Sequence, residues 1–288
     1  MKLSAKHLKR YKEIAGLLWK YGRSDLAQKL SVDDDFASPS LPGNTDIAPA
    51  ELANDLEAMG PTYVKLGQML AGRPDLLPDP YLKALSRLQD RVTPFPFAQV
   101  EEIILAELGV RISKAFARFD PEPLAAASLG QVHLAALRDG RPVVVKVQRP
   151  DIRPLIAEDF DVLEQIAAAL DDHTDIGARV RFGGLVEEFR FTIQQELNYE
   201  REAQNLISVG QNLKKFPLIV VPQPVLDYCT RCILTMEYIP GAKITALGPL
   251  ARIDRLDGAA LAEEMFKAYL KQVLVDGLFH ADPHPGNI

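Results

Sequence analysis

A short β-hairpin in the middle of the chain constrains the fold more than any other segment. The run Val143–Gln148 (VVVKVQ) is rich in β-branched residues, as is typical of a strand, and Leu129–Leu137 predicts a strand before it. Between them, Asp139-Gly140 is a strong signal for a tight turn. Since a parallel pair of strands would need a longer crossover, this turn implies an antiparallel sheet.

Helical patterns flank the hairpin on both sides. The predicted helices cover Ala48–Met59, Tyr63–Ala71, Pro80–Gln89, Phe97–Leu108, Pro154–Leu170, Leu185–Val209 and Asp257–Asp276. A short strand is predicted at Phe116–Phe119, and a second strand pair at Leu218–Leu226 and Cys232–Tyr238. Helices and antiparallel strands in separate runs indicate an α+β fold.

Charge excludes one class of function and marks one end of the chain. The 288 residues carry a net charge of −6, which is unsuited to a general nucleic-acid binder, because neutralising phosphates needs a basic face. The segment 1–23 nevertheless has a local net charge of +6 and apolar residues at helical spacing. Such a basic amphipathic helix either lies on an anionic membrane surface or packs on the body of the protein with its lysines in solvent.

The last loop, His280–Asn287 (HADPHPGN), carries the clearest chemistry. Asp282 and Asn287 stand five residues apart on a stretch stiffened by prolines. A carboxylate that orients the attacking group and oxygen ligands for Mg²⁺ are what phosphoryl transfer requires, and the spacing matches the H-x-D-x-x-x-x-N loop of kinases. The alternatives are a transition-metal site made of His280, Asp282 and His284, and a merely structural turn.

A lysine within the hairpin and a loop before it extend this hypothesis. Lys146 lies in the second strand, after a small-residue segment, Ala125–Ser128, at the place where kinases carry a glycine-rich cover over the phosphates. Here alanines replace most of those glycines, and Gly130 remains as a permissive hinge. The alternatives are a lysine that simply points to solvent and a small-residue strand end packed under a helix.

Two glutamates and a second lysine complete the candidate set. A half-buried lysine needs an anionic partner, and Glu196 and Glu202 are available on one predicted helix, about 120° apart around its axis. One of them is expected to pair with Lys146 and the other with a second cation. Lys65 is such a cation, and Gln68 shares its helical face. The alternative for each is a solvated helix surface.

These motifs, in this order, resemble the UbiB/ADCK-like atypical kinases, the ubiquinone-biosynthesis (aarF-domain) branch of the protein-kinase-like superfamily. The resemblance covers residues 51–288 and rests on several motifs taken together. They are K-x-G-Q at Lys65–Gln68, the alanine-rich loop followed by LGQVH, the strand lysine in VVVKVQRP, an E-x-D…E-A pattern at Glu196–Asn198 and Glu202-Ala203, and the closing HADPHPGN.

The resemblance implies a role for each matching residue. Lys146 is expected to bind the nucleotide phosphates with Glu202 as its helix partner, under a cover made of Ala125, Ala126, Ala127 and Ser128. Glu237 and Ile239 match the linker that meets adenine, Asp282 the catalytic aspartate and Asn287 a magnesium ligand. Lys65, Gln68 and Glu196 match a regulatory extension that folds over the active site. ATP or ADP and Mg²⁺ are the implied ligands.

The same resemblance implies a fold and a division of the chain. We expect a protein-kinase-like fold with an antiparallel-sheet N-lobe, a helical N-terminal extension and a truncated C-lobe. Residues 1–32 would form the basic helix, 46–110 the extension with the K-x-G-Q motif, 111–240 the kinase-like N-lobe, and 241–288 the start of the C-lobe.

The implied function is that of an ATP-binding atypical kinase or ATPase that supports ubiquinone production. Lipid or quinone precursors and an anionic membrane surface are its implied partners, and a cytoplasmic, peripheral position on a bacterial inner membrane or an organellar equivalent is its implied location. Two departures stand out. Asn198 replaces the aspartate of E-x-D, and no D-F-G-like aspartate follows Asn287, so this chain is expected to be inactive by itself. The alternatives are a small-molecule phosphotransferase of the aminoglycoside or choline kinase type, and a non-catalytic nucleotide- or lipid-binding module.

Overall fold

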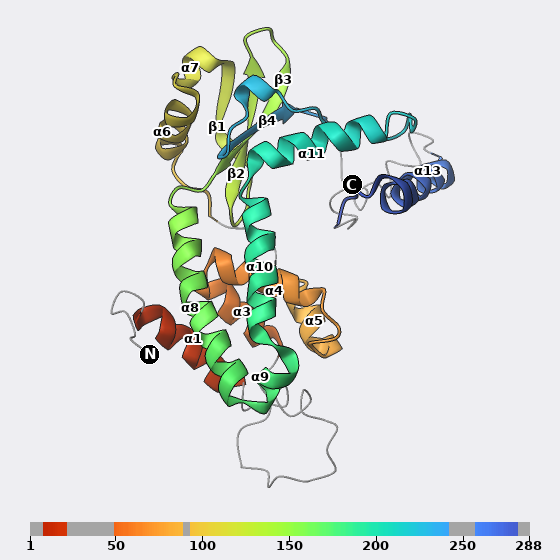
Figure 1. Ribbon diagram of the computed structural model, residues 1–288. Helices are drawn as coiled ribbons and strands as arrows, with labels where there is room; N and C mark the ends of the chain where they lie inside the picture. The colour runs from red at the N-terminus through yellow and green to blue at the C-terminus, as the bar shows by residue number, and fades with distance from the viewer. Residues whose placement is uncertain (1–7, 22–48, 89–92, 242–256, 282–288) are drawn as a thin grey trace. The chain divides into compact units, whose positions relative to one another are not determined.

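The computed structural model describes residues 8–21, 49–88, 93–241 and 257–281 (Figure 1). They divide into two compact units that are interleaved along the sequence. The helical unit comprises residues 1–95, 125–131 and 148–197, and the sheet unit comprises residues 96–124, 132–147 and 198–288. The predicted four-part division of the chain stays a prediction.

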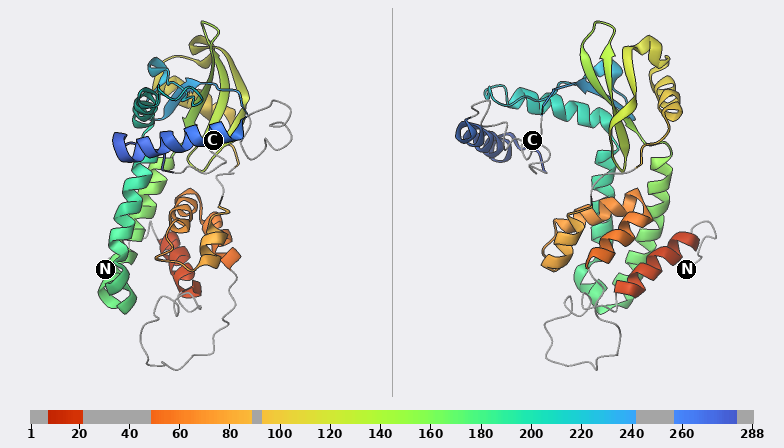
Figure 2. Two further views of the ribbon diagram at one scale, coloured as in Figure 1. Left: turned by 90° about the vertical axis from the view of Figure 1, so that its right-hand side faces the viewer. Right: turned by 180° about the vertical axis from the view of Figure 1, so that it is seen from behind.

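The helical unit is built around two long helices that run side by side, α8 (Ile152–His173) and α10 (Phe182–Glu196), as Figure 2 shows. Their facing sides bury Ile156, Phe160, Phe189 and Ile193 in one apolar core. A second core joins α8 to the shorter helices of this unit. These are α1 (Leu8–Tyr21), α3 (Pro49–Met59), α4 (Pro61–Ala71) and α5 (Asp79–Leu85), while α9 (Asp175–Val180) connects α8 to α10.

The basic N-terminal helix packs on the protein. Tyr11, Ile14 and Tyr21 of α1 are buried in the second core, so this apolar face is already covered. Arg10 forms an ion pair at 2.8 Å with the buried Asp159 of α8, and Lys20 forms one at 2.8 Å with Asp55 of α3. The structure therefore favours the packing alternative for α1. Among the described helices, none is long and apolar enough to cross a membrane.

The described strands of the sheet form one four-stranded antiparallel sheet in the order β1-β2-β3-β4. The strands are β1 (Phe116–Ala126), β2 (Gly130–Leu137), β3 (Pro142–Gln148) and β4 (Ile233–Glu237). The predicted hairpin joins β2 to β3, and its turn is closed by the Leu137 N–H, which donates to the Arg141 carbonyl at 2.9 Å. Gly140 has a φ of 88°, a left-handed conformation that explains the Asp-Gly pair.

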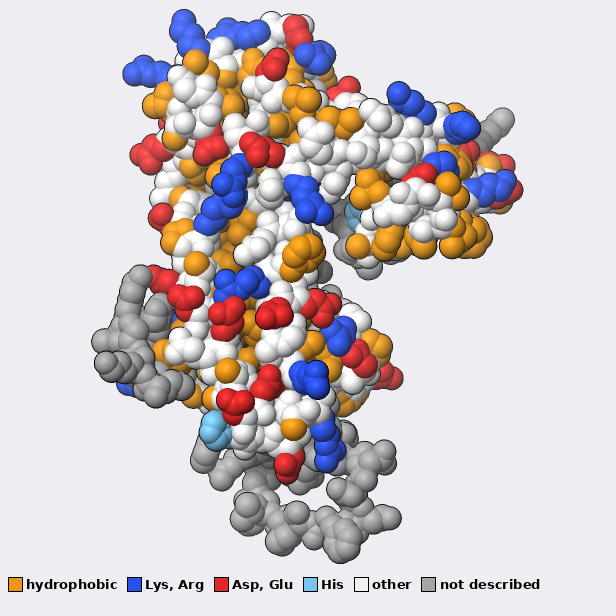
Figure 3. Space-filling model, viewed as in Figure 1, with side chains coloured by type: hydrophobic (Ala, Val, Ile, Leu, Met, Phe, Trp, Pro, Cys, Tyr) orange, Lys and Arg blue, Asp and Glu red, His pale blue; other side chains and the backbone are white. Residues whose placement is uncertain are grey.

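The sheet unit also contains helices. They are α6 (Phe97–Leu108), α7 (Ile112–Ala115), α11 (Tyr199–Asn212), the 3₁₀ turn η2 (Leu226–Tyr228), α13 (Gly258–Lys271) and the π-helical turn η4 (Gln272–Asp276). On α13 and η4 a group of large apolar side chains faces outward, and Phe266, Leu274 and Val275 are each more than 60% exposed (Figure 3). The α+β class predicted from the sequence is confirmed.

Three predicted elements differ from the structure. The strand predicted at Phe116–Phe119 continues to Ala126. The segment Leu218–Leu226 is not a strand and makes one isolated bridge, between Pro224 and Met236, because Pro222 and Pro224 have no N–H to donate to a ladder. The helix predicted at Leu185–Val209 is interrupted after Glu196, with consequences for the candidate site.

A valine at Gly67 should destabilise the helical unit. Gly67 lies on α4 where a Cβ atom would overlap the side chain of Leu88 and would stand 3.1 Å from Cδ1 of Leu56. Overfilling a packed core costs about 1–3 kcal/mol. We expect Gly67→Val to lower the free energy of unfolding by about that amount, measured by chemical denaturation.

The matched control is Gly184→Val on α10, where nothing lies within 4 Å of the added Cβ. That variant should change stability by no more than about 0.5 kcal/mol, as exposed substitutions usually do. Equal effects of the two variants would contradict the packing explanation for Gly67.

Candidate functional site

Strand pairing and one helix bring Lys146 and Glu202 together in the sheet unit. Lys146 lies on β3 directly opposite Leu234 of β4. Tyr199 and Ala203, one turn apart on α11, pack on that same Leu234. Because Glu202 is next to Ala203 on α11, this packing places Glu202 beside Lys146.

The two side chains form a close, two-pronged ion pair. Nζ of Lys146 donates to Oε2 of Glu202 at 2.8 Å and to Oε1 at 3.0 Å. The ammonium also stands 4.6 Å from the ring centre of Tyr199, within the range of a cation–π contact. Lys146 is 29% exposed and Glu202 is 36% exposed, so the lysine is held in place and is still open to solvent. A fixed, accessible ammonium group fits an anionic ligand such as a phosphate.

The alanine-rich loop is a tight connection between β1 and β2. Ala125 and Ala126 end β1, and the N–H of Ala127 donates to the carbonyl of Gly130 at 2.8 Å. Ala125 is exposed, whereas Ser128 is fully buried. The part of the loop open to a ligand is thus the alanine segment. The predicted contact of Ser128 with phosphates stays a prediction.

In the helical unit, Lys65 and Gln68 are held by separate partners. Nζ of Lys65 forms an ion pair with Glu196 at 3.0 Å, and the amide of Gln68 donates to the Leu88 carbonyl at 3.1 Å. Between them, Leu66 packs against the core of α8 and α10. The structure therefore brings Lys65 and Glu196 together, as one of the sequence hypotheses proposed.

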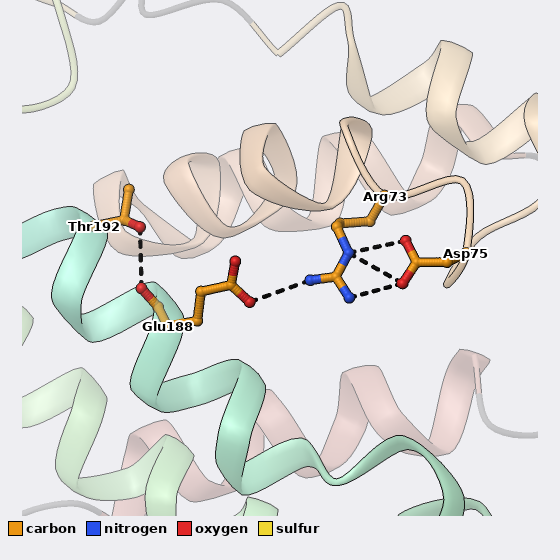
Figure 4. Close-up of polar contacts among 4 residues, drawn as sticks. All are labelled: Arg73, Asp75, Glu188 and Thr192. Atoms are coloured by element: carbon orange, nitrogen blue, oxygen red, sulfur yellow. Dashed lines mark hydrogen bonds and ion pairs between the residues drawn. The ribbon is translucent and has the colours of Figure 1, made fainter. Parts of the chain in front are cut away.

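A second polar contact ties the end of α4 to α10. Figure 4 shows Arg73, just after α4, between Asp75 and Glu188 of α10. The guanidinium donates to both carboxylate oxygens of Asp75, at distances of 2.7–3.2 Å, and to Glu188 at 3.3 Å. The Thr192 hydroxyl donates to the backbone carbonyl of Glu188 at 3.0 Å. With the Lys65 pair, the α4 segment is tied to α10 at two points, one within α4 and one just after it.

Glu196 and Glu202 do not share one helix, which corrects the sequence prediction. Glu196 ends α10, and Asn198 begins α11 as its N-cap, since its side-chain oxygen accepts a hydrogen bond from the N–H of Arg201 at 3.1 Å. Asparagine and aspartate are both good N-caps, so Asn198 retains the local role that an aspartate would have there. Asn198 is a typical N-cap residue in the middle of the predicted helix, so the sequence did contain a signal for this break.

The carbonyl of Leu197, at the break, is an acceptor for two side chains that sequence reasoning missed. The amide of Gln148, at the end of β3, donates to it at 3.0 Å, and the guanidinium of Arg153 on α8 donates to it as well. Arg153 also donates to the Gln148 side-chain oxygen at 2.8 Å. No short motif marks these residues, because their contact depends on the tertiary fold.

The remaining predicted residues are only partly described. Glu237 ends β4, and its carboxylate accepts a hydrogen bond from the N–H of Gln223 at 3.0 Å, while Ile239 is 46% exposed. Asp282 and Asn287 lie outside the described residues. Within the described ranges, no group of three His, Cys, Asp or Glu side chains is arranged to hold a metal ion.

Comparison with protein families gives a specific match. Residues 87–288 match the family described as "ABC1 atypical kinase-like domain". Among curated proteins, the chain is 42% identical over 239 residues to "Protein ACTIVITY OF BC1 COMPLEX KINASE 8, chloroplastic" of Arabidopsis thaliana, covering 82% of this chain and 31% of that protein. It is 41% identical over 232 residues to "Probable protein kinase UbiB" of Cellvibrio japonicus, covering 81% of this chain and 42% of that protein. The chain thus spans less than half the length of these relatives.

A solved structure is also similar. It is "The complex structure of Rv3197-erythromycin from Mycobacterium tuberculosis", with 28% sequence identity and a TM-score of 0.52. The similarity covers 82% of this chain and 59% of the other.

The Lys65–Glu196 pair should make a small, measurable contribution to stability. Lys65 is 15% exposed and Glu196 is 40% exposed, so solvent screens the pair in part. A double-mutant cycle with Lys65→Met and Glu196→Gln should give a coupling free energy of about 0.2–1 kcal/mol in chemical denaturation. The control is a cycle on Lys267 and Glu263 of α13, both more than 60% exposed. A coupling no larger than in that control would contradict the conclusion that this pair helps to hold α4 against α10.

Proposed function

The chain belongs to the ABC1 atypical kinase-like family, and from that membership we propose that it binds adenine nucleotides with Mg²⁺ at the Lys146–Glu202 pair. The observation that supports the proposal most is the geometry of this pair, two contacts of 2.8 and 3.0 Å on a lysine that remains 29% exposed. A lysine in this state offers its charge to phosphate oxygens without having to be ordered first.

The other predicted residues are assigned around this pair. Ala125, Ala126, Ala127 and Ser128 cover the phosphates, and Glu237 and Ile239, at the end of β4 and just beyond it, meet the adenine. Asp282 orients the attacking group, and Asn287 contributes an oxygen ligand for Mg²⁺. Bound Mg²⁺ would neutralise charge on the phosphates. The carboxylate and amide oxygens of these two residues are ligand types that this ion accepts.

The helical segment with Lys65, Gln68 and Glu196 is proposed as the regulatory extension. Its support is the attachment of the α4 segment to α10 at two points, from Lys65 to Glu196 and from Arg73 to Glu188. In the kinases that this chain resembles, such an extension folds over the place where a protein substrate would otherwise bind. We therefore propose ATP hydrolysis, or phosphoryl transfer to a small or lipid acceptor, as the reaction of the longer proteins that contain this domain.

The proposed biological role is supported by the names of the relatives. Because several relatives are called UbiB, we propose that the chain supports ubiquinone biosynthesis, with lipid or quinone precursors as partners and a peripheral position on a membrane. The chloroplastic name of the Arabidopsis relative supports an organellar setting for other members.

A second candidate is the binding of a small organic molecule. The observation that favours it is the solved structure that resembles this chain, a complex with erythromycin according to its title. Saturable erythromycin binding that competes with ATP would favour this candidate. If erythromycin does not compete with ATP, the nucleotide-binding proposal is favoured.

Replacing Lys146 by alanine should weaken ATP binding. The lost interaction is charge-assisted and is worth about 1.5–3 kcal/mol, which corresponds to an increase in Kd of about 10- to 150-fold. Isothermal titration with ATP in Mg²⁺ measures this change.

The control for Lys146→Ala is Lys83→Ala, which removes an exposed lysine from α5 and should leave Kd unchanged. An unchanged Kd in the Lys146 variant would reassign the phosphate lysine. A wild-type chain without measurable affinity for ATP would overturn the proposed function.

Replacing Asn287 by alanine should affect binding only when Mg²⁺ is present. Loss of a metal-binding group is expected to weaken MgATP binding by about tenfold, with little change for ATP measured in EDTA. The same titration, run in the two buffers, gives both values. Equal losses in Mg²⁺ and in EDTA would remove Asn287 from the metal site.

A further inference from the structure

The tip of the alanine-rich loop is packed within the helical unit. Leu129, at this tip, is 6% exposed and belongs to the apolar core that contains Ile156 of α8 and Phe189 of α10. The glycine-rich cover of a kinase is a permissive loop, whereas this one carries a large apolar side chain that is buried among helices.

Arg149, directly after β3, holds the same tip by polar contacts. Its Nε donates to the Ser128 carbonyl at 3.3 Å, and its terminal nitrogen donates to the Thr93 carbonyl at 3.1 Å. Its backbone N–H donates to the Leu129 carbonyl at 2.8 Å. The guanidinium carbon stands 5.4 Å from the ring centre of Phe95. One residue thus binds two successive carbonyls of the loop and joins them to the segment before α6.

Gln131 makes a matching connection from the other side of the tip. Its side-chain oxygen accepts a hydrogen bond from the Phe95 N–H at 2.9 Å, and its amide donates to the Phe95 carbonyl at 3.3 Å. Gln131 is only 1% exposed. The segment that faces Arg149 is therefore itself fixed to the loop.

These contacts have an electrostatic consequence for the loop. Backbone carbonyl oxygens carry partial negative charge and would repel a phosphate, and here the carbonyls of Ser128 and Leu129 are directed to Arg149 instead. The described partners of the Arg149 side chain are neutral groups, and burial lowers the pKa of the guanidinium. Carbonyl dipoles and the aromatic ring are what stabilise this charge.

We propose that Arg149 is a positioning residue that clamps the tip of the alanine-rich loop, so that Ala125–Ala127 act as a rigid shelf for the nucleotide phosphates. This inference rests on the proposed nucleotide function and adds a residue that the motifs did not assign. A lysine would replace Arg149 only in part, because an ammonium lacks the fixed fork that reaches two carbonyls at once.

Hydrogen exchange at residues 125–131 tests the clamp directly. We expect Arg149→Gln to speed exchange of these amides about tenfold, and Arg149→Lys to have a smaller effect in the same direction. The matched control is Arg138→Lys, since Arg138 also donates to two backbone carbonyls, those of Ser113 and Lys114, far along the hairpin from the tip. Unchanged exchange at 125–131 in both Arg149 variants overturns the clamp, and so does an increase spread evenly over α8 and α10.

Binding of ATP and of adenosine tests what the clamp is for. Adenosine has no phosphates, so Arg149→Gln should raise the Kd of ATP about three- to tenfold and leave the Kd of adenosine within twofold. An equal loss for both ligands indicates a general structural role and overturns the inference. A wild-type chain that binds no ATP overturns the proposed nucleotide function. In that case, the hydrogen-exchange measurement still shows whether Arg149 holds the loop tip.

Discussion

The candidate site depends on one contact between a helix and a strand. Tyr199 and Ala203 of α11 pack on Leu234 of β4, and Leu234 lies opposite Lys146 in the sheet. Without this packing, Lys146 would keep its charge in solvent and Glu202 would be an ordinary surface carboxylate. An ion pair as exposed as this one contributes little stability by itself. The apolar contact therefore fixes the positions of Lys146 and Glu202, and their ion pair determines the charge that is presented to a ligand.

The same division between apolar packing and polar contacts holds in the helical unit. Leu66 and Met69 of α4 pack against the core of α8 and α10, and Lys65 and Arg73 add ion pairs at the two ends of that contact. Gly67 permits the close approach of α4 to Leu88. In the K-x-G-Q motif, lysine, glycine and glutamine thus each have a structural reason, whether or not they also act on a ligand.

How much could be predicted differs from residue to residue. The hairpin with Asp139-Gly140 was predictable because a two-residue turn and a β-branched strand are local signals. The break after Glu196 was missed, although Asn198 is an N-cap residue, because the helical pattern continues on both sides of it. The prediction of a strand at Leu218–Leu226 was wrong, because its prolines cannot donate the backbone hydrogen bonds of a strand ladder, although the segment also contains β-branched residues.

By itself the sequence determined the α+β class, the antiparallel hairpin, the order of the motifs and the family, because each of these depends on residue types and spacings within short segments of the chain. Only the tertiary structure decided that Lys146 pairs with Glu202 while Lys65 pairs with Glu196. It alone showed that Gln148 and Arg153 hold the Leu197 carbonyl and that Arg149 holds the loop tip. These contacts join residues 21 to 131 positions apart, and hydrogen-bond partners at such separations are set by the packing of helices and strands rather than by spacing along the chain.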